Sequence, residues 1–335
     1  MRAAIYGLAG ERLSADERDF FRDADPAGYI LFRRNCLDRE QLRSLTDDLR
    51  AIHGRPDLPI LIDQEGGRVA RLQPPVWPRL PAAQRFAEVY ERAPISAIEA
   101  ARVNAQAIGL MLHEVGITVN CMPLLDVRQP GAHDIIGDRA FGSESMQVAA
   151  LGRAVLDGLR ESGVVGIVKH MPGHGRSMCD SHVELPVVRA SAEELEVDIE
   201  PFRSLRKAPM GMSAHVVYTE WDAAHCGSLS STVIGDVIRG RIGFDGWLMS
   251  DDIGMNALGG DFGARARGVL AAGCDVALHC SGVMEEMVAV ANGVRDMTAE
   301  GHERLERAMA TVSPAGQCPS YEELAAKRDS LLAYA

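Results

Sequence analysis

Residues 164–182 have the sequence V-V-G-I-V-K-H-M-P-G-H-G-R-S-M-C-D-S-H, an apolar run followed by a loop of unusual composition. The continuous aliphatic run at 164–168 is typical of a strand buried on both faces in a parallel sheet. The loop that follows holds three histidines, two glycines, a proline and an aspartate. Because loops on a rigid scaffold commonly carry reactive groups, we expect this strand to position a functional loop.

Similar apolar runs recur along the chain and alternate with amphipathic or alanine- and leucine-rich segments. We expect strands at residues 3–7, 28–32, 59–62, 118–122, 166–168, 210–213, 247–250 and 275–278. We expect helices at residues 15–24, 39–53, 95–115, 144–161, 192–205, 232–241, 263–272 and 282–295. Apolar strands that alternate with helices indicate a parallel sheet covered on both faces. Eight such units predict an α/β fold, a (β/α)8 TIM-like barrel forming a single domain over residues 1–335 with C-terminal helices.

The composition, 47% hydrophobic and 24% charged, is that of a globular protein. The net charge of -12 argues against nucleic acid or an anionic membrane as partner, since both need a basic surface. No apolar run approaches the ~20 residues that span a bilayer, and the first ten residues lack the apolar core of a signal peptide. Seven dispersed cysteines without a C-x-x-C pair are typical of reduced thiols. We therefore expect a cytoplasmic protein, and we expect it to be a monomer.

Polar and charged residues gather where the predicted strands end, which is where such barrels form their active sites. They comprise Asp63, Glu65, Arg68 and Arg71 after the third strand, Asp126 and Arg139 after the fourth, Lys169 and His170 after the fifth, His215 after the sixth, and Asp251 and Asp252 after the seventh. A random arrangement would scatter these side chains. Their placement therefore predicts a functional site at the carboxyl end of the barrel.

The pair Asp180 and His182 is the part of the loop best suited to proton transfer, because an aspartate can orient an imidazole and tune its basicity. An Asp-Ser-His triplet alone is more often a capped turn, so this interpretation depends on the other residues at the site. A strand carboxylate with such a dyad fits glycoside hydrolysis with retention, which needs a nucleophile and an acid/base. Charged side chains around the site suit a sugar, since each buried hydroxyl needs a hydrogen-bond partner.

Several strings along the barrel carry a family resemblance. They are I-D-Q-E-G-G-R-V-A-R at 62–71, K-H-M-P-G-H-G at 169–175 with D-S-H at 180–182, M-S-A-H-V at 212–216, and G-F-D-G-W-L-M-S-D-D at 243–252. In this order they resemble glycoside hydrolase family 3, in its single-domain β-N-acetylglucosaminidase branch, over about residues 28–258. The resemblance implies that Asp251 is the nucleophile and His182 the acid/base, with Asp180 as its partner. It also implies that the sugar is bound by Asp63, Arg71, Arg139, Lys169 and His170.

The resemblance implies a retaining exo-β-N-acetylglucosaminidase that releases terminal β-linked N-acetylglucosamine. The implied substrates are fragments of N-acetylglucosamine and 1,6-anhydro-N-acetylmuramic acid, with or without peptide, from peptidoglycan recycling. This chemistry needs no metal or organic cofactor. The larger β-glucosidases of the family take their acid/base from a second domain, for which we expect no room in this chain.

Two other functions remain open on the sequence alone. One is a metal-dependent barrel hydrolase, because histidines and carboxylates can bind zinc, although no H-x-H or H-E-x-x-H motif is present. Its candidate ligands are His170, His174, His182, His215 and Asp251. The other is an inactive barrel that acts as a binding protein, which the intact nucleophile and dyad make the weaker hypothesis.

The roles of neighbouring residues also carry expectations. Successive strand residues point to opposite faces, so we expect Asp251 to face the site and Asp252 to support it by hydrogen bonding. We expect His174 to shape the loop and His215 to line the pocket. The two glycines after Glu65 indicate a buried turn role for that residue, not a second acid.

Overall fold

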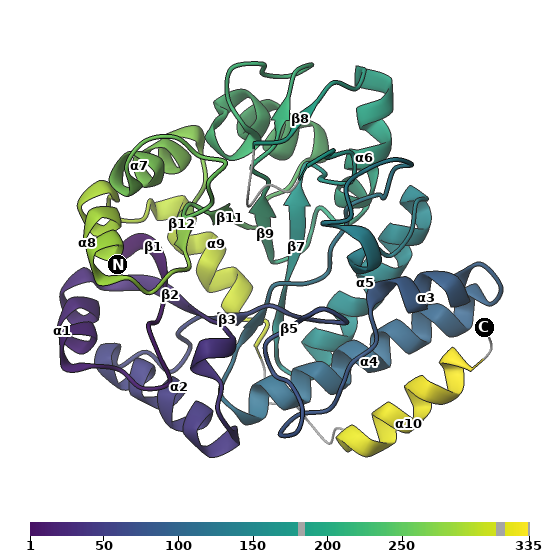
Figure 1. The fold of residues 1–335 in the computed structure, drawn as a ribbon, viewed down its shortest axis with the longest axis horizontal. Helices are drawn as coiled ribbons and strands as arrows, with labels where there is room; N and C mark the ends of the chain where they lie inside the picture. The colour runs from purple at the N-terminus through teal and green to yellow at the C-terminus, as the bar shows by residue number, and fades with distance from the viewer. Residues whose placement is uncertain (180–184, 313–318, 334–335) are drawn as a thin grey trace.

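The computed structural model describes residues 1–179, 185–312 and 319–333, so Asp180 and His182 lie outside the described residues. Eight parallel strands close into a barrel in the order β1-β12-β11-β9-β7-β6-β3-β2 (Figure 1). They are β1 (Arg2–Gly7), β2 (Pro26–Leu31), β3 (Ile60–Ile62), β6 (Val119–Asn120), β7 (Val165–Met171), β9 (Met210–Ser213), β11 (Trp247–Asp252) and β12 (Val276–His279). The predicted α/β barrel is confirmed, and each of the eight predicted strands contributes to it.

Helices surround this barrel (Figure 1). They are α1 (Ala15–Ala24), α2 (Arg39–His53), α3 (Ala83–Tyr90), α4 (Pro94–Glu114), α5 (Ser145–Glu161), α6 (Ala192–Ser204), α7 (Phe262–Ala272), α8 (Met284–Gly293), α9 (Ala299–Met309) and α10 (Tyr321–Leu332), with a π-helix, η4 (Val233–Ile242), and short 3-10 turns η1 (Arg33–Asn35), η2 (Gly137–Arg139) and η3 (Gly227–Leu229). The helix predicted at 232–241 is thus a π-helix. The expected C-terminal helices are α9 and α10, of which α10 packs along α4.

Local sequence signals explain where many of these helices begin and end. An N-cap side chain accepts a hydrogen bond from the first turn and so satisfies one of its free N–H groups. Such caps are made by Ser14, Asp38, Ser191, Asp261, Thr298 and Ser320. The ends of α2 and α7 fall at Gly54 and Gly273, which have the left-handed backbone that favours glycine.

Some short elements were not predicted. They are the hairpin of β4 (Gln64–Gly66) and β5 (Val69–Ala70), the small sheet of β8 (Val187–Val188) and β10 (Val217–Tyr218), and helix α3. Strands of two or three residues have no alternating pattern to detect. The hairpin turn depends on its glycines, because a Cβ on Gly66 would lie 2.2 Å from the Pro81 oxygen. This turn brings the residues that follow β3 in front of the barrel (Figure 1).

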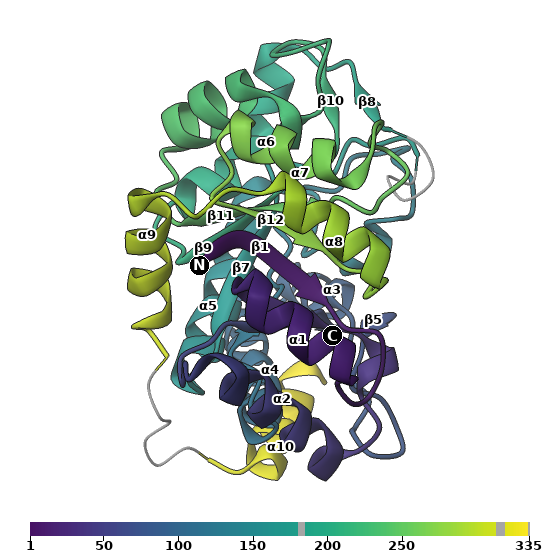
Figure 2. The same ribbon diagram turned by 90° about the vertical axis from the view of Figure 1, so that its left-hand side faces the viewer.

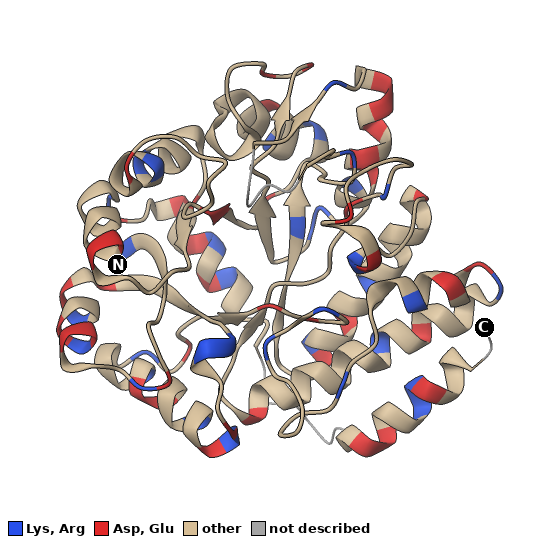
Figure 3. Cartoon of the chain, in the orientation of Figure 1, with Lys and Arg blue, Asp and Glu red and all other residues tan. Residues whose placement is uncertain are grey.

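The barrel interior is apolar, with fully buried residues such as Ile5, Leu61, Ile167 and Met249. Charged residues lie mostly on the outer helices and loops, but they also occur toward the carboxyl ends of β7 and β11 (Figure 3). Lys169 on β7 is only 2% exposed. A buried ammonium group is rare unless carboxylates compensate it, so this end of the barrel marks a site. Among the described helices, none has both the length and the apolar composition to cross a bilayer.

Candidate active site

A cavity of about 580 Å³ opens at the carboxyl end of the barrel strands. Its walls include all the sugar-binding residues predicted from the sequence, together with the predicted nucleophile: Asp63, Arg71, Arg139, Lys169, His170 and Asp251. The volume lies within the range of small-molecule sites. The structure therefore brings these six residues to one cavity, whereas the predicted acid/base dyad lies outside the described residues.

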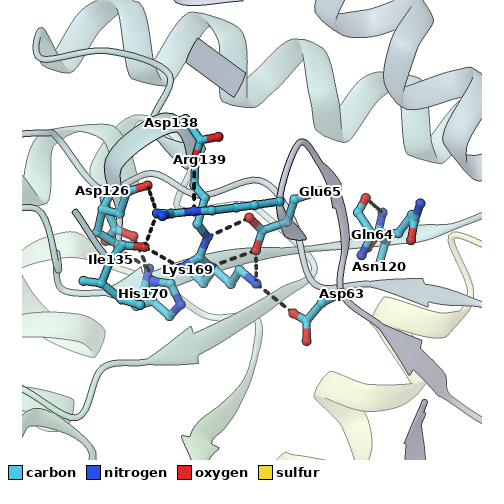
Figure 4. Close-up of polar contacts among 12 residues, drawn as sticks. Asp63, Gln64, Glu65, Asn120, Asp126, Ile135, Asp138, Arg139, Lys169 and His170 are labelled. Atoms are coloured by element: carbon cyan, nitrogen blue, oxygen red, sulfur yellow. Dashed lines mark hydrogen bonds and ion pairs between the residues drawn. The ribbon is translucent and has the colours of Figure 1, made fainter. Parts of the chain in front are cut away.

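Lys169 extends from β7 between two carboxylates. Its Nζ lies 2.9 Å from Asp63 Oδ1 and 2.7 Å from Glu65 Oε1 (Figure 4). Burial by itself would lower the pKa of Lys169, but the two carboxylates hold it above its ordinary value. Burial opposes ionisation of Asp63 too, yet Lys169 and Arg71 keep its pKa below the ordinary value. Lys169 and Asp63 are therefore both charged at neutral pH.

Glu65 also holds Arg139 in a bidentate pair. Both Nε and Nη2 of the guanidinium donate to the Glu65 carboxylate at 2.9 Å (Figure 4). Arg71 in turn donates from Nη2 to Asp63 Oδ2 at 3.1 Å. Three cations and two carboxylates thus form one network whose pairs fix the cavity-lining donors in place. Glu65 is buried as expected, but its part as the anchor of Arg139 and Lys169 was not predicted.

Arg71 has one donor that lacks a hydrogen-bond partner. Its Nε is buried and has no hydrogen-bond partner among the described residues. The guanidinium carbon lies 5.2 Å from the centre of the Phe32 ring, which restricts the side chain from one face. An unpaired buried N–H costs about 1–3 kcal/mol.

Asp126 orients His170, a role that was not predicted. Its Oδ2 lies 2.8 Å from His170 Nδ1, and its Oδ1 accepts the backbone N–H groups of His170 and His174 at 3.2 and 2.7 Å. Burial raises the pKa of Asp126, but His170 and His174 outweigh it and lower this pKa to about 2. The ionised carboxylate requires the proton of His170 on Nδ1. This carboxylate thereby fixes the orientation of the His170 ring at the cavity.

Both Asp251 and Asp252 line the cavity, so the expectation that only one of them faces it is wrong. Strict alternation would turn them to opposite faces, but the register of β11 against β12 shifts between Met249 and Asp252. Asp252 supports the backbone around the cavity through hydrogen bonds. Its Oδ1 accepts the backbone N–H groups of Gly254 and Cys280 at 2.9 and 3.2 Å.

The two carboxyl groups differ in their ionisation. Burial and the neighbouring charge of Asp251 raise the pKa of Asp252. Burial also opposes ionisation of Asp251, but His170, His215 and the backbone N–H of Asp252 leave its pKa below the ordinary value. Asp251 is therefore the more acidic of the two and stays ionised at neutral pH. That is the state that a carboxylate nucleophile needs.

His215 is not among the side chains that line the cavity, which corrects the expectation for this residue. It is fully buried, with Nδ1 2.6 Å from Ser228 Oγ and Nε2 3.0 Å from the Asp252 carbonyl oxygen. It thereby supports the end of β11. His174 holds the loop through its backbone N–H, as expected, and its side chain also lines the cavity.

The metal alternative requires several ligand atoms that converge on one point. Within residues 1–179, 185–312 and 319–333, no group of three or more His, Cys, Asp or Glu side chains is arranged to hold a metal ion. Both ring nitrogens of His215 and one of His170 are already engaged in hydrogen bonds. The described residues therefore give the zinc hypothesis no ligand set.

Gln64 and Asn120 are further residues that sequence reasoning missed. The Gln64 backbone N–H donates to Asn120 Oδ1, and Asn120 Nδ2 donates to the Gln64 carbonyl oxygen, both at 3.0 Å (Figure 4). The Gln64 side-chain oxygen accepts the backbone N–H groups of Arg71 and Leu72 at 2.8 and 2.9 Å. These bonds fix the backbone that carries Asp63, Glu65 and Arg71. The sequence signal that could have identified Gln64 and Asn120 is their position as polar residues at the apolar strand segments.

Comparison with known proteins places these features in a family context. Residues 3–313 match the model of the glycosyl hydrolase family 3 N terminal domain. A beta-hexosaminidase of Bordetella avium is 38% identical over 282 residues, which cover 83% of this chain and 80% of that protein. Native NagZ from Neisseria gonorrhoeae has a TM-score of 0.88 at 30% identity, covering 98% and 97% of the two chains. The same enzyme in complex with N-trifluoroacetyl-D-glucosamine has a TM-score of 0.87 at 30% identity, covering 99% and 97%.

Proposed function

The chain belongs to glycosyl hydrolase family 3, and on that premise we propose that it is a retaining exo-β-N-acetylglucosaminidase. The observation that carries this proposal is the shared cavity of Asp251 and the charged cluster around Lys169. Further support comes from the relatives named beta-hexosaminidase and from the NagZ relative crystallised with an N-acylated glucosamine.

In the proposed reaction, Asp251 attacks the anomeric carbon of a terminal β-linked N-acetylglucosamine while His182 gives a proton to the departing oxygen. The bond to the aglycone breaks, and a bond to the Asp251 carboxylate forms. Water then gives its proton to His182 and displaces Asp251, so the sugar leaves with its original configuration. Asp180 stabilises the positive charge that His182 carries before it protonates the departing oxygen and regains when it takes the proton of water.

The charged cluster is suited to an uncharged sugar ring. Asp63 and Glu65 neutralise most of the charge on Arg71, Arg139 and Lys169, so the cluster offers fixed donors and acceptors with little excess charge. Each oxygen of Asp63 accepts one hydrogen bond, from Lys169 or Arg71, and retains a lone pair for a sugar hydroxyl. Sugar hydroxyl groups that bind here replace their hydrogen bonds to water with hydrogen bonds to these protein groups.

We further propose that the natural substrates are fragments of N-acetylglucosamine and 1,6-anhydro-N-acetylmuramic acid, with or without peptide, formed in peptidoglycan recycling. The reaction would take place in the cytoplasm, with residues 1–335 acting as one catalytic domain in a monomer and without a cofactor. Support for this finer assignment comes from the sequence motifs of the single-domain branch and from the NagZ relatives, of which this chain covers nearly the whole length.

A comparison of two chromogenic substrates tests the proposed activity. We expect kcat/KM for nitrophenyl β-N-acetylglucosaminide to exceed that for nitrophenyl β-glucoside by about 10²-fold or more, because a site built around a polar group discriminates strongly against its absence. Equal rates, or a preference for the glucoside, would refute the specificity. Lasting loss of activity after treatment with a chelator would favour the metal-dependent alternative.

Substitution of the proposed acid/base gives a result that depends on the leaving group. We expect His182→Ala to lower kcat/KM about 10³-fold for disaccharides, whose leaving oxygen needs a proton, and far less for dinitrophenyl glycosides. His225→Ala is the matched control, because this histidine has a side chain 61% exposed and pairs with Asp222. Equal losses on both kinds of substrate would contradict protonation of the leaving group by His182.

A further inference from the structure

A second cavity, of about 510 Å³, lies at the opposite end of the barrel, where β7, β9 and β11 begin. Figure 2 shows α9 at this end and β5 at the other. Apolar side chains contribute to the wall of this second cavity, among them Leu156 on α5, Leu205 and Pro209 before β9, and Ala308 on α9. Its volume falls in the range of small-molecule sites.

Cations predominate over carboxylates in this cavity. Arg153, Arg160, Arg206, Lys207 and Arg307 line it, against Asp157 and Asp245. Each carboxylate already has an arginine partner: Asp245 Oδ2 lies 3.0 Å from Arg307 Nη2, and Asp157 Oδ1 lies 3.9 Å from Arg160 Nη2. The excess positive charge therefore belongs to the other three cations, Arg153, Arg206 and Lys207.

None of these three side chains is neutralised by a carboxylate among the described residues, and the two arginines are held by carbonyl oxygens. Arg153 Nη2 donates to the Ser204 carbonyl oxygen at 2.8 Å, and Arg206 Nη1 donates to the Arg203 carbonyl oxygen at 3.3 Å. Within the described part of the chain, neither arginine nor Lys207 forms an ion pair with a carboxylate. All three residues are exposed to solvent and thus accessible to a ligand.

An uncompensated basic cavity stands out on a chain whose net charge is -12. Like charges gathered in one concave surface repel each other and create a local positive potential that attracts anions. Guanidinium groups match the oxygen geometry of phosphate, and an ammonium group adds a point charge. Three positive charges also match a phosphate dianion or diphosphate better than a single carboxylate.

We propose that this cavity binds a small organic phosphate. Its phosphoryl oxygens contact Arg153, Arg206 and Lys207, and its apolar part packs against Leu156, Leu205 and Pro209. The site is separate from the sugar cavity in its lining residues and does not depend on the proposed glycosidase activity.

Calorimetric titration of the full chain with ATP and with inorganic pyrophosphate tests this proposal. We expect ATP to bind with a Kd below about 1 mM and pyrophosphate to bind more weakly, because only ATP has an apolar ring system for the cavity wall. Arg206→Gln combined with Lys207→Gln should weaken both about tenfold or more, since it removes two charge-assisted contacts. Added salt should weaken binding in the unsubstituted protein.

Arg92→Gln combined with Arg267→Gln is the matched control, because it removes two exposed cations that do not line the cavity. It should leave both affinities unchanged, and hydrolysis of the nitrophenyl substrate should be unchanged in both double variants. The proposal is overturned if neither probe binds at about 1 mM. It is also overturned if the control variant weakens binding as much as the cavity variant does. Equal affinities for the two probes would overturn the role given to the apolar wall.

Discussion

Replacement of Asp251 with glycine is expected to lower kcat/KM for nitrophenyl β-N-acetylglucosaminide by at least about 10⁴-fold. Asp251 lies near the carboxyl end of β11 at the cavity, and its pKa lies below the ordinary value despite burial, so it is present as the carboxylate. Without it, no group in the proposed mechanism can form the bond to the anomeric carbon. Steady-state rates of nitrophenol release measure the loss.

Added azide should restore part of this activity, because a small anion can occupy the space left by the carboxylate. The expected product is the α-glycosyl azide, with the configuration inverted relative to the substrate. Asp252→Asn is the matched control, since an amide oxygen still accepts the N–H groups of Gly254 and Cys280. It should retain more activity than Asp251→Gly and show no azide product. Unchanged turnover in Asp251→Gly would assign the nucleophile to another residue.

The barrel could be predicted because its signals are long and local. Eight apolar runs separated by helical segments each identify a strand, and the parallel arrangement follows from the connections between them. The hairpin β4–β5 could not be predicted in this way, because residues 64–70 are mostly polar, charged or glycine and form no apolar run. The π-helix η4 was predicted as an ordinary helix, since both have apolar residues at similar intervals.

The members of the site could be predicted to a greater extent than their contacts. Asp63 and Arg71 follow β3, and Lys169 and Asp251 lie near the carboxyl ends of β7 and β11, so topology alone brings them to one end. The pairing of Glu65 with Arg139 depends on the hairpin and the loop before α5, whose paths are not encoded by a repeating pattern. The inward position of Asp252 depends on a register shift in β11 that breaks the alternation used for the prediction.

Replacement of Glu65 with leucine is expected to destabilise the protein by about 3–5 kcal/mol, the range found when one partner of a buried ion pair is removed. Arg139, with a side chain 11% exposed, loses both of its carboxylate bonds, and Lys169 keeps Asp63 alone. The cluster would then hold three cations against one carboxylate. The free energy of unfolding in urea measures this change.

The double variant Glu65→Leu with Arg139→Met separates ion pairing from packing. It removes both partners of the bidentate pair, so it should be more stable than Glu65→Leu alone, although it loses a further contact. A double variant that is less stable than either single variant would show that packing, and not uncompensated charge, accounts for the effect. Glycosidase activity should stay low in both, because Arg139 loses its anchor in Glu65→Leu and is absent from the double variant.

The pH dependence of stability gives an independent test of the same carboxylate. The pKa of Glu65 is lowered in the folded protein, where Lys169 and Arg139 outweigh the effect of burial. Its contribution to stability is therefore complete above its unfolded pKa of about 4.3 and is lost as the pH falls through the lower folded value. Asp126, with a pKa of about 2, also loses its contribution to stability as the pH falls. The unsubstituted protein should therefore lose stability steeply below about pH 4. Glu65→Gln should be less stable at neutral pH and should decline less over this range, because the lost carboxylate can no longer take up a proton. Parallel curves for the two proteins would mean that Glu65 does not carry the charge that fixes Arg139 and Lys169 at the cavity.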